Sequence, residues 1–342
     1  MRLLLAATLA VFLMSLSSAV SATPLFASDV PLRVALQGPV NAIARKAAGS
    51  TEPHPATLTL TVPAGEVHPI RLSARGLSRR KGDICRFPPL RVEFSTAPAA
   101  ASLFAGQRRL KLVTHCQSSA GFQQHLLREY AAYKLYNLIS PLSFRARLAT
   151  VDYVDADGRP IVTRFGFFIE DKDDAFRRNG LRPALTGDRI VATQLNPRHS
   201  ARMALFQYMI GNLDWSMRAG PEGEGCCHNA RLAQVGGSYA PMPYDFDFSG
   251  LVDAPYAVPP DGLPVRSVRN RLYRGYCRHN GEALAVAAEV RTLRPRLEAV
   301  FGQVPGIDER SRQKAIAYLA GFFADIASDA TVRSKLLRYC IP

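Results

Sequence analysis

After residue 22 the sequence has no apolar run near the roughly 20 residues that a membrane-spanning helix needs. The opening stretch, MRLLLAATLAVFLMSLSSAVSA, has one Arg, a short apolar core and a small-residue ending at Val20-Ser21-Ala22. This pattern predicts a secretory signal cleaved after Ala22 rather than a retained anchor. No Cys follows the small residues, which argues against a lipid-anchored lipoprotein. We therefore expect a mature chain without a transmembrane segment, periplasmic or secreted.

Signatures of several enzyme classes are also missing. The chain has no G-x-S-x-G motif and no paired Cys/His arrangement, which disfavours a hydrolase. It has no C-x2-C pair and no nearby His pair, so a zinc site has no support in the spacing. No internal repeat or long low-complexity tract is visible, and the length suits one large domain or two modest ones.

Acidic residues are scarce relative to basic ones. The 28 Asp and Glu face 43 Lys and Arg, for a formal charge of +15, with basic clusters at 79–86, 108–109 and 265–278. Such an excess favours an anionic partner, among them phosphate groups, acidic glycans or an envelope surface, with nucleic acid the least favoured. The alternative is a basic surface that only reflects an Arg-rich composition.

Six cysteines in an exported chain predict disulfides. We expect Cys85 to pair with Cys116. Cys226 and Cys227 are adjacent, and a bond between neighbours would strain the backbone, so we expect each to pair with Cys277 or Cys340 in an order that stays open.

The order of predicted elements is informative. Residues 31–116 are strand-like, 122–139 has helical spacing, and 145–170 forms a hairpin around the turn at Asp157-Gly158. A helix over 197–213, a Gly-rich loop over 214–229, a strand in YAPMPYDFDFSG and a helical remainder over 281–340 follow. This order predicts an α+β, two-lobed protein-kinase-like fold. Its β-rich N-terminal lobe would span 23–170 with one helix, and its mostly helical C-terminal lobe 171–342.

Three residues in the first part suggest a nucleotide site. Lys111 lies in a strand and Glu129 in the following helix, a layout that lets a carboxylate hold an ammonium against phosphates. Glu170 ends a strand where the lobes would join and a base could be received. The structural alternative is that Lys111 is a solvated strand residue and Glu129 an exposed helix residue.

The second part supplies polar oxygen groups. Asp214 follows a long helix, Asn229 opens a short strand-like segment, and Asp245 and Asp247 lie in PYDFDFSG. Mg²⁺ takes oxygen ligands, and an attacking hydroxyl needs an acceptor for its proton, so this order fits phosphoryl transfer. The alternative is a structural cluster in which Asp214 caps a helix and Asp245 meets buried arginines.

These segments resemble a known family. RLSARGLSRR, LKLVTHC, LLREYAAYKLYN, FGFFIE, IGNLDWS, HNARL and PYDFDFSG are similar to successive motifs of the spore-coat protein H kinases, atypical secreted kinases with a reduced protein-kinase-like fold. The resemblance spans roughly 70–252. It implies that Lys111 contacts phosphates, Glu129 positions Lys111, Asp214 is the catalytic base, and Asn229 binds metal with Asp245 or, in the other register, Asp247.

Two departures from that family are visible. Asp214 and Asn229 are fifteen residues apart, where protein kinases have about five. The loop ARGLSRRKGD is not a G-x-G-x-x-G phosphate loop, and we expect Arg75, Arg79 and Arg80 to meet phosphates as charges.

The expected function is an exported phosphotransferase that uses ATP, or another nucleotide, with Mg²⁺ or Mn²⁺. Its acceptor would be a protein or an envelope component of unknown identity. The alternative is a catalytically inactive module that binds an anionic envelope or protein ligand.

Overall fold

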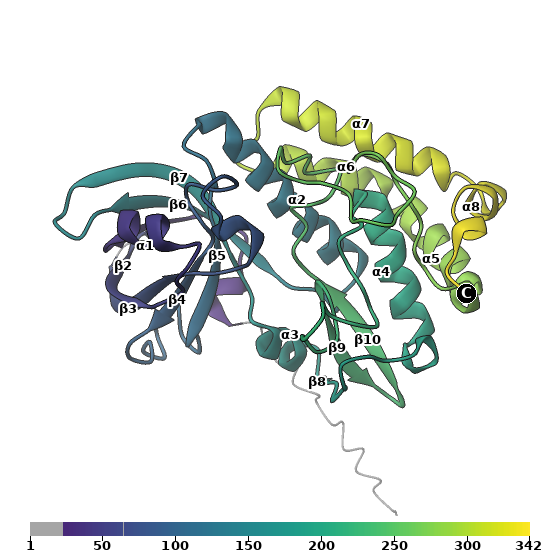
Figure 1. The fold of residues 1–342 in the computed structure, drawn as a ribbon, viewed down its shortest axis with the longest axis horizontal. Helices are drawn as coiled ribbons and strands as arrows, with labels where there is room; N and C mark the ends of the chain where they lie inside the picture. The colour runs from purple at the N-terminus through teal and green to yellow at the C-terminus, as the bar shows by residue number, and fades with distance from the viewer. Residues whose placement is uncertain (1–22, 64) are drawn as a thin grey trace, which may run out of the picture.

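Seven strands of the first half of the chain close into a barrel (Figure 1). The computed structural model describes residues 23–63 and 65–342, so the predicted signal segment lies outside the described residues. The strand order around the barrel is β1-β2-β3-β4-β5-β7-β6, with β1 parallel to β6 and the other pairs antiparallel. The strands are β1 Leu32–Gln37, β2 His54–Val62, β3 Glu66–Ala74, β4 Leu90–Phe94, β5 Arg109–Val113, β6 Ala146–Val154 and β7 Pro160–Ile169.

Alternating side chains fill the barrel. Successive residues of a strand point to opposite faces, so every second residue can face inward. In β1 the buried residues are Leu32, Val34 and Leu36. They belong to one apolar cluster with Leu58 of β2 and Leu112 of β5. Burial of this cluster stabilises the barrel and fixes which side chains of each strand remain outside.

The second half of the chain is mainly helical and packs beside the barrel, as Figure 1 shows. The helices are α1 Val40–Lys46, α2 Gln123–Ile139, α3 Lys172–Arg178, α4 Pro197–Ile210, α5 Asn280–Thr292, α6 Arg294–Gln303, α7 Glu309–Asp325 and α8 Asp329–Lys335. A small sheet of β8 Arg182–Pro183, β9 Ala230–Val235 and β10 Ser238–Pro243 lies at their edge. Within the described ranges no single helix has the length and apolar character to span a membrane; only the bent pair 309–325 and 329–339 meets both criteria jointly.

The expected two-lobed protein-kinase-like fold is wrong. The chain instead forms a closed seven-stranded mixed barrel, a small three-stranded sheet and eight helices within residues 23–63 and 65–342. The difference arises because β1 joins the first hairpins to β6, and this parallel pair closes the sheet on itself. Closure leaves the barrel without free strand edges.

Individual elements agree better with their predicted positions. The helix expected over 122–139 is α2, and the hairpin expected over 145–170 is β6 and β7. The helix expected over 197–213 ends earlier, at Ile210, because Gly211 adopts a left-handed φ of 63° and caps it.

All six cysteines are paired. The predicted Cys85–Cys116 bond is confirmed. The predicted pairing of Cys226 and Cys227 with Cys277 and Cys340 is wrong, because the neighbours bond to each other and Cys277 bonds to Cys340. The second bond forms where the chain end returns to the start of the helical remainder, since the residues flanking the two cysteines are bridge partners there.

Candidate functional site

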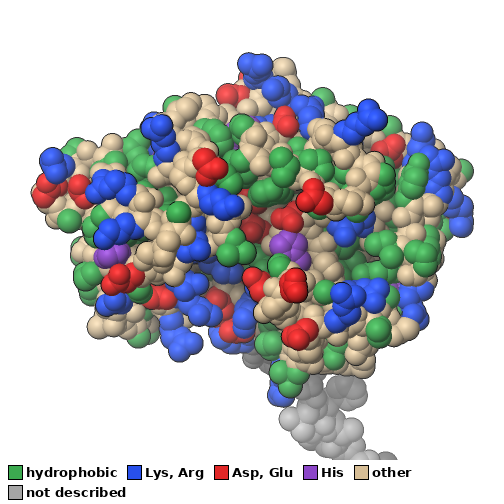
Figure 2. All heavy atoms as spheres, in the orientation of Figure 1, with side chains coloured by type: hydrophobic (Ala, Val, Ile, Leu, Met, Phe, Trp, Pro, Cys, Tyr) green, Lys and Arg blue, Asp and Glu red, His purple; other side chains and the backbone are tan. Residues whose placement is uncertain are grey.

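A pocket of about 640 Å³ opens between the barrel and the helical part of the molecule. Figure 2 shows acidic side chains and a histidine gathered near the middle of this face, with basic side chains toward the barrel. Its polar and charged lining includes Arg75, Arg79, Asp214, His228, Asn229, Arg231, Tyr244, Asp245 and Asp247. The segments that supply these groups follow β3, α4 and β10 or lie at the start of β9.

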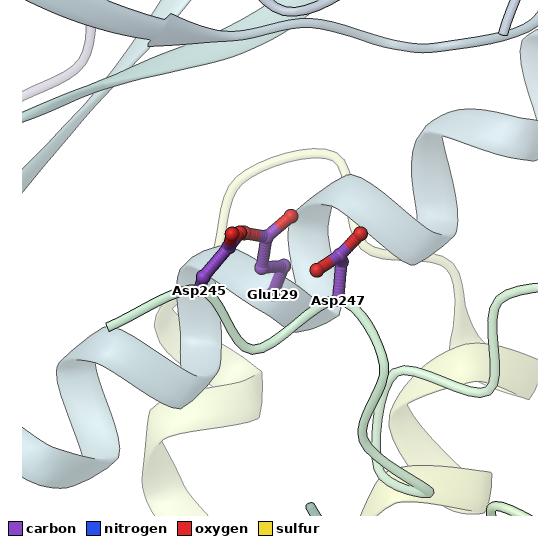
Figure 3. Close-up of side chains that lie close together, drawn as sticks. All are labelled: Glu129, Asp245 and Asp247. Atoms are coloured by element: carbon purple, nitrogen blue, oxygen red, sulfur yellow. The ribbon is translucent and has the colours of Figure 1, made fainter. Parts of the chain in front are cut away.

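Three carboxylates meet beside the pocket, and two of them, Asp245 and Asp247, line it. Glu129 projects from α2, and Asp245 and Asp247 project from the segment after β10 (Figure 3). One oxygen of each lies within 4.8 Å of the others. We call Glu129, Asp245 and Asp247 the carboxylate cluster.

Arg79 inserts its guanidinium into the carboxylate cluster. Its nitrogens lie 3.4 Å from Glu129 Oε2, 3.1 Å from Asp245 Oδ1 and 3.2 Å from Asp247 Oδ2. Arg79 and two of the three acids are almost fully buried. One cation therefore faces three carboxyl groups in a desolvated place, which leaves the cluster short of positive charge.

The pKa values of the two buried acids are raised in this environment. Burial raises the pKa of Glu129 and of Asp247, while Arg79 lowers both and the neighbouring acids raise them further. Glu129 Oε1 is also buried without a hydrogen-bond partner. Three carboxylates with an unused oxygen form the hard donor set that Mg²⁺ or Mn²⁺ takes, so these residues fit a divalent cation.

Backbone strain concentrates at this site. Asn229 and Asp245 have φ values of 49° and 64°, in the left-handed region that residues other than Gly seldom adopt. The backbone N–H of Asp245 donates a 3.0 Å hydrogen bond to the hydroxyl of buried Tyr133. Such conformations persist only where the surroundings hold them, and they are common at functional sites.

Asp214 lies across the pocket from the carboxylate cluster with its carboxylate held on two sides. His228 Nε2 lies 2.7 Å from Asp214 Oδ1, and Asn229 Nδ2 donates to Asp214 Oδ2 at 3.0 Å. The Asp214 side chain is about one-third exposed, at 32%. It does not cap a helix, contrary to the structural alternative, because Gly211 caps α4, and Asp214 lines the pocket.

Three basic side chains in or next to the pocket lack ion-pair partners among the described residues. Arg75, Lys111 and Arg231 form no ion pair with any described residue, and we call them the cationic trio. Lys111 Nζ and Arg231 Cζ lie 5.3 and 4.7 Å from the centre of the Tyr244 ring. Burial, then Arg75 and Arg231, lower the pKa of Lys111 to about 8. The cationic trio can therefore bind an anion.

Glu170 is not available to a ligand. It is fully buried at 0% exposure, and Arg178 holds both of its oxygens at 2.8 and 2.9 Å. The backbone N–H of Arg145 donates to it as well. The carboxylate expected to receive a nucleotide base instead ties β7 to α3 and the start of β6.

The structure brings most of the predicted site residues to one pocket but changes their partners. Glu129 pairs with Arg79, and the expected ion pair with Lys111 does not form. Asp245 and Asp247 both belong to the carboxylate cluster, so neither register is excluded. Asn229 lies beside them but binds Asp214 through its amide nitrogen.

Sequence reasoning assigned no role to His228, Arg231 or Tyr244. His228 and Arg231 lie within the quoted motif HNARL, and Tyr244 within PYDFDFSG. The sequence does place these residues within two positions of Asn229 or Asp245, but adjacency does not show which way a side chain points.

Comparison of the chain with known protein families and with curated proteins found no match.

Proposed function

We propose that this protein is a metal-dependent phosphotransferase that takes its phosphoryl group from a nucleotide. The observation that supports it is the pairing of opposite charges in one pocket. Arg75 and Arg231 of the unpaired cationic trio line the pocket with Asp245 and Asp247, and Lys111 lines the adjoining recess that shares Arg231. The carboxylate cluster is itself short of positive charge. A phosphate chain with a divalent cation carries both kinds of charge, and it would neutralise both groups at once.

The chain's own residues have separable roles in this proposal. Arg75, Lys111 and Arg231 hold phosphate oxygens and keep the chain oriented. Asp214 accepts the proton of the acceptor hydroxyl, while His228 and Asn229 fix the direction of its carboxylate. Glu129, Asp245 and Asp247 would hold the cation, which when bound offsets charge on the phosphate oxygens.

A second candidate is a non-catalytic module that binds an anionic ligand. The observation in its favour is Arg79, which already contacts all three carboxylates and so gives the cluster a cation of its own. In that case the cluster is structural and only the cationic trio binds ligand.

Two substitutions separate the candidates. Under the phosphotransferase proposal Asp245→Asn abolishes metal-dependent nucleotide affinity, because a neutral amide removes one charge without opening a cavity. Asp214→Asn retains binding but lowers turnover by roughly 10²–10⁴-fold, since it removes the proton acceptor. The measurement is nucleotide titration with and without Mn²⁺, together with transfer to a general acceptor protein.

The matched control is Asp261→Asn, an exposed carboxylate in the loop before α5. It should behave as the unsubstituted protein in both assays. Unchanged metal-dependent affinity in Asp245→Asn would favour the non-catalytic module.

A further inference from the structure

A second, smaller recess of about 190 Å³ joins the main pocket at Arg231, which lines both. Its charged lining is five basic side chains and one acid, Arg91, Arg109, Lys111, Lys172, Arg231 and Asp171. The remaining lining is Leu110 and Ile169. We call this the outer recess.

The barrel strands place like charges opposite one another in the outer recess. Arg91 of β4 is the cross-strand partner of Lys111 of β5, and Arg109 lies two residues before Lys111 on the same face. Like charges directly opposite destabilise a sheet. Glu93 of β4 is opposite Arg109 and offsets part of this repulsion, but it leaves one acid against three cations. An anion lying over them would gain from all three cations.

Two arginines of the outer recess are only weakly engaged by acids, whereas Lys172 forms a 2.6 Å ion pair with Asp173. Arg109 lies 3.7 Å from Asp171, and Arg91 lies 4.0 Å from Glu93, and both arginines are about half exposed. Exposed pairs of this kind contribute little and yield readily to a stronger anion. Together with the cationic trio, these groups form a basic track along the outer recess and the main pocket, which share Arg231.

The outer recess offers little that would recognise a base. Pockets for planar rings are mostly apolar, with a few directed polar groups. Here only two aliphatic side chains accompany six charged ones, and Glu170 is fully occupied by Arg178 and Arg145. The charged lining of the outer recess matches phosphoryl groups, and in the main pocket the Tyr244 ring is already covered by Lys111 and Arg231.

We propose that the outer recess extends the phosphate site, so that the protein recognises its ligand by the phosphate chain alone and binds linear inorganic polyphosphate. This inference rests on the proposed function, which makes the main pocket a phosphate-binding site. It deepens that proposal by naming the ligand class that the track takes.

The test compares affinities of tripolyphosphate, ATP, GTP and AMP for the oxidised chain 23–342, by calorimetry with Mn²⁺ at fixed ionic strength. Tripolyphosphate, ATP and GTP should agree within about threefold, and AMP should bind at least about tenfold more weakly. Affinity for the first three should fall together as salt is raised, because the contacts are ionic.

The variant pair Arg109→Gln with Lys172→Gln removes two positive charges from the outer recess, that of exposed Arg109 and that of half-buried Lys172. It should weaken tripolyphosphate and ATP alike by about tenfold, consistent with the loss of charge-assisted hydrogen bonds. Arg333→Gln, an exposed arginine of α8 with no ion pair among the described residues, is the control and should change neither.

The outcomes distinguish this inference from the proposed function. ATP binding more than about tenfold tighter than tripolyphosphate, and unaffected by the variant pair, would overturn the inference while a phosphotransferase remains. Tripolyphosphate binding that the variant pair weakens, without phosphoryl transfer from any donor, would support the inference and contradict the proposed function. Absence of binding by every phosphate compound would overturn both.

Discussion

Arg79 is the residue whose removal tests the charge balance of the carboxylate cluster. Arg79→Gln leaves three carboxylates without the one cation that forms ion pairs with them among the described residues, and breaking a buried ion pair costs about 3 kcal/mol or more. We expect lower stability in urea unfolding without metal. Mn²⁺ should restore more of the free energy of unfolding in this variant than it adds to the unsubstituted protein, because the cation replaces the guanidinium.

The control for Arg79→Gln is Arg266→Gln, an exposed arginine in the loop before α5. It should leave unfolding unchanged with and without Mn²⁺. A variant of Arg79 that loses stability but gains nothing from Mn²⁺ would indicate that the cluster does not bind metal.

The lowered pKa of Lys111 predicts how phosphate affinity depends on pH. Its pKa of about 8 lies below the ordinary 10.5, through burial and through Arg75 and Arg231, against the opposite effects of Asp171 and Asp245. Between about pH 8 and pH 10.5, Lys111 is protonated in the unfolded chain but mostly deprotonated in the folded protein. The contribution of Lys111 to stability therefore rises with pH in this range. Phosphate affinity should move the other way and fall as pH rises through 8, because the ammonium is lost.

Lys111→Arg tests this assignment because a guanidinium stays protonated across the same range. Nucleotide titrations at a series of pH values should show a smaller decline in this variant. An equal decline in both proteins would mean that another group titrates.

At the scale of elements, the end of α4 sets the position of Asp214. Gly211 terminates α4 with a φ of 63°, and a Cβ there would overlap the Tyr318 hydroxyl. Gly211→Ala should therefore lower the free energy of unfolding by about 1–3 kcal/mol. Thermal and urea unfolding measure this cost.

Gly281, near the start of α5, is the matched comparison. A Cβ there meets no atom within 4 Å, and its φ is not left-handed. Gly281→Ala should leave stability unchanged or raise it by up to about 1 kcal/mol, since Ala loses less backbone freedom in a helix. Equal destabilisation by both substitutions would contradict the role given to Gly211.

At the scale of the whole molecule, local patterns predicted elements but not their closure into a barrel. Alternation along 57–62 and helical spacing along 122–139 are local, and β2 and α2 appear there. The parallel pairing of β1 with β6 joins residues more than a hundred positions apart, and no local pattern encodes it. The predicted fold class was therefore wrong, although the predicted positions of many helices and strands were right.

The residues of the candidate site could be predicted from the sequence, but their partners could not. Residue type and order were enough to single out Asp214, Asn229, Asp245 and Asp247, because phosphoryl transfer needs polar oxygen groups. Partner choice was not predictable, because Arg79 reaches Glu129 across 50 positions and Asp245 across 166. Only the folded chain shows that an arginine, rather than Lys111, neutralises Glu129.

In the proposed function the cationic trio and the carboxylate cluster act on one ligand together. The most direct test is the affinity for Mn²⁺, measured by electron paramagnetic resonance with and without saturating ATP. Binding free energies of two linked ligands are reciprocal, so we predict that ATP raises Mn²⁺ affinity by about tenfold or more beyond complexation in solution, and that Asp245→Asn removes this gain. Equal Mn²⁺ affinity with and without ATP would contradict the claim.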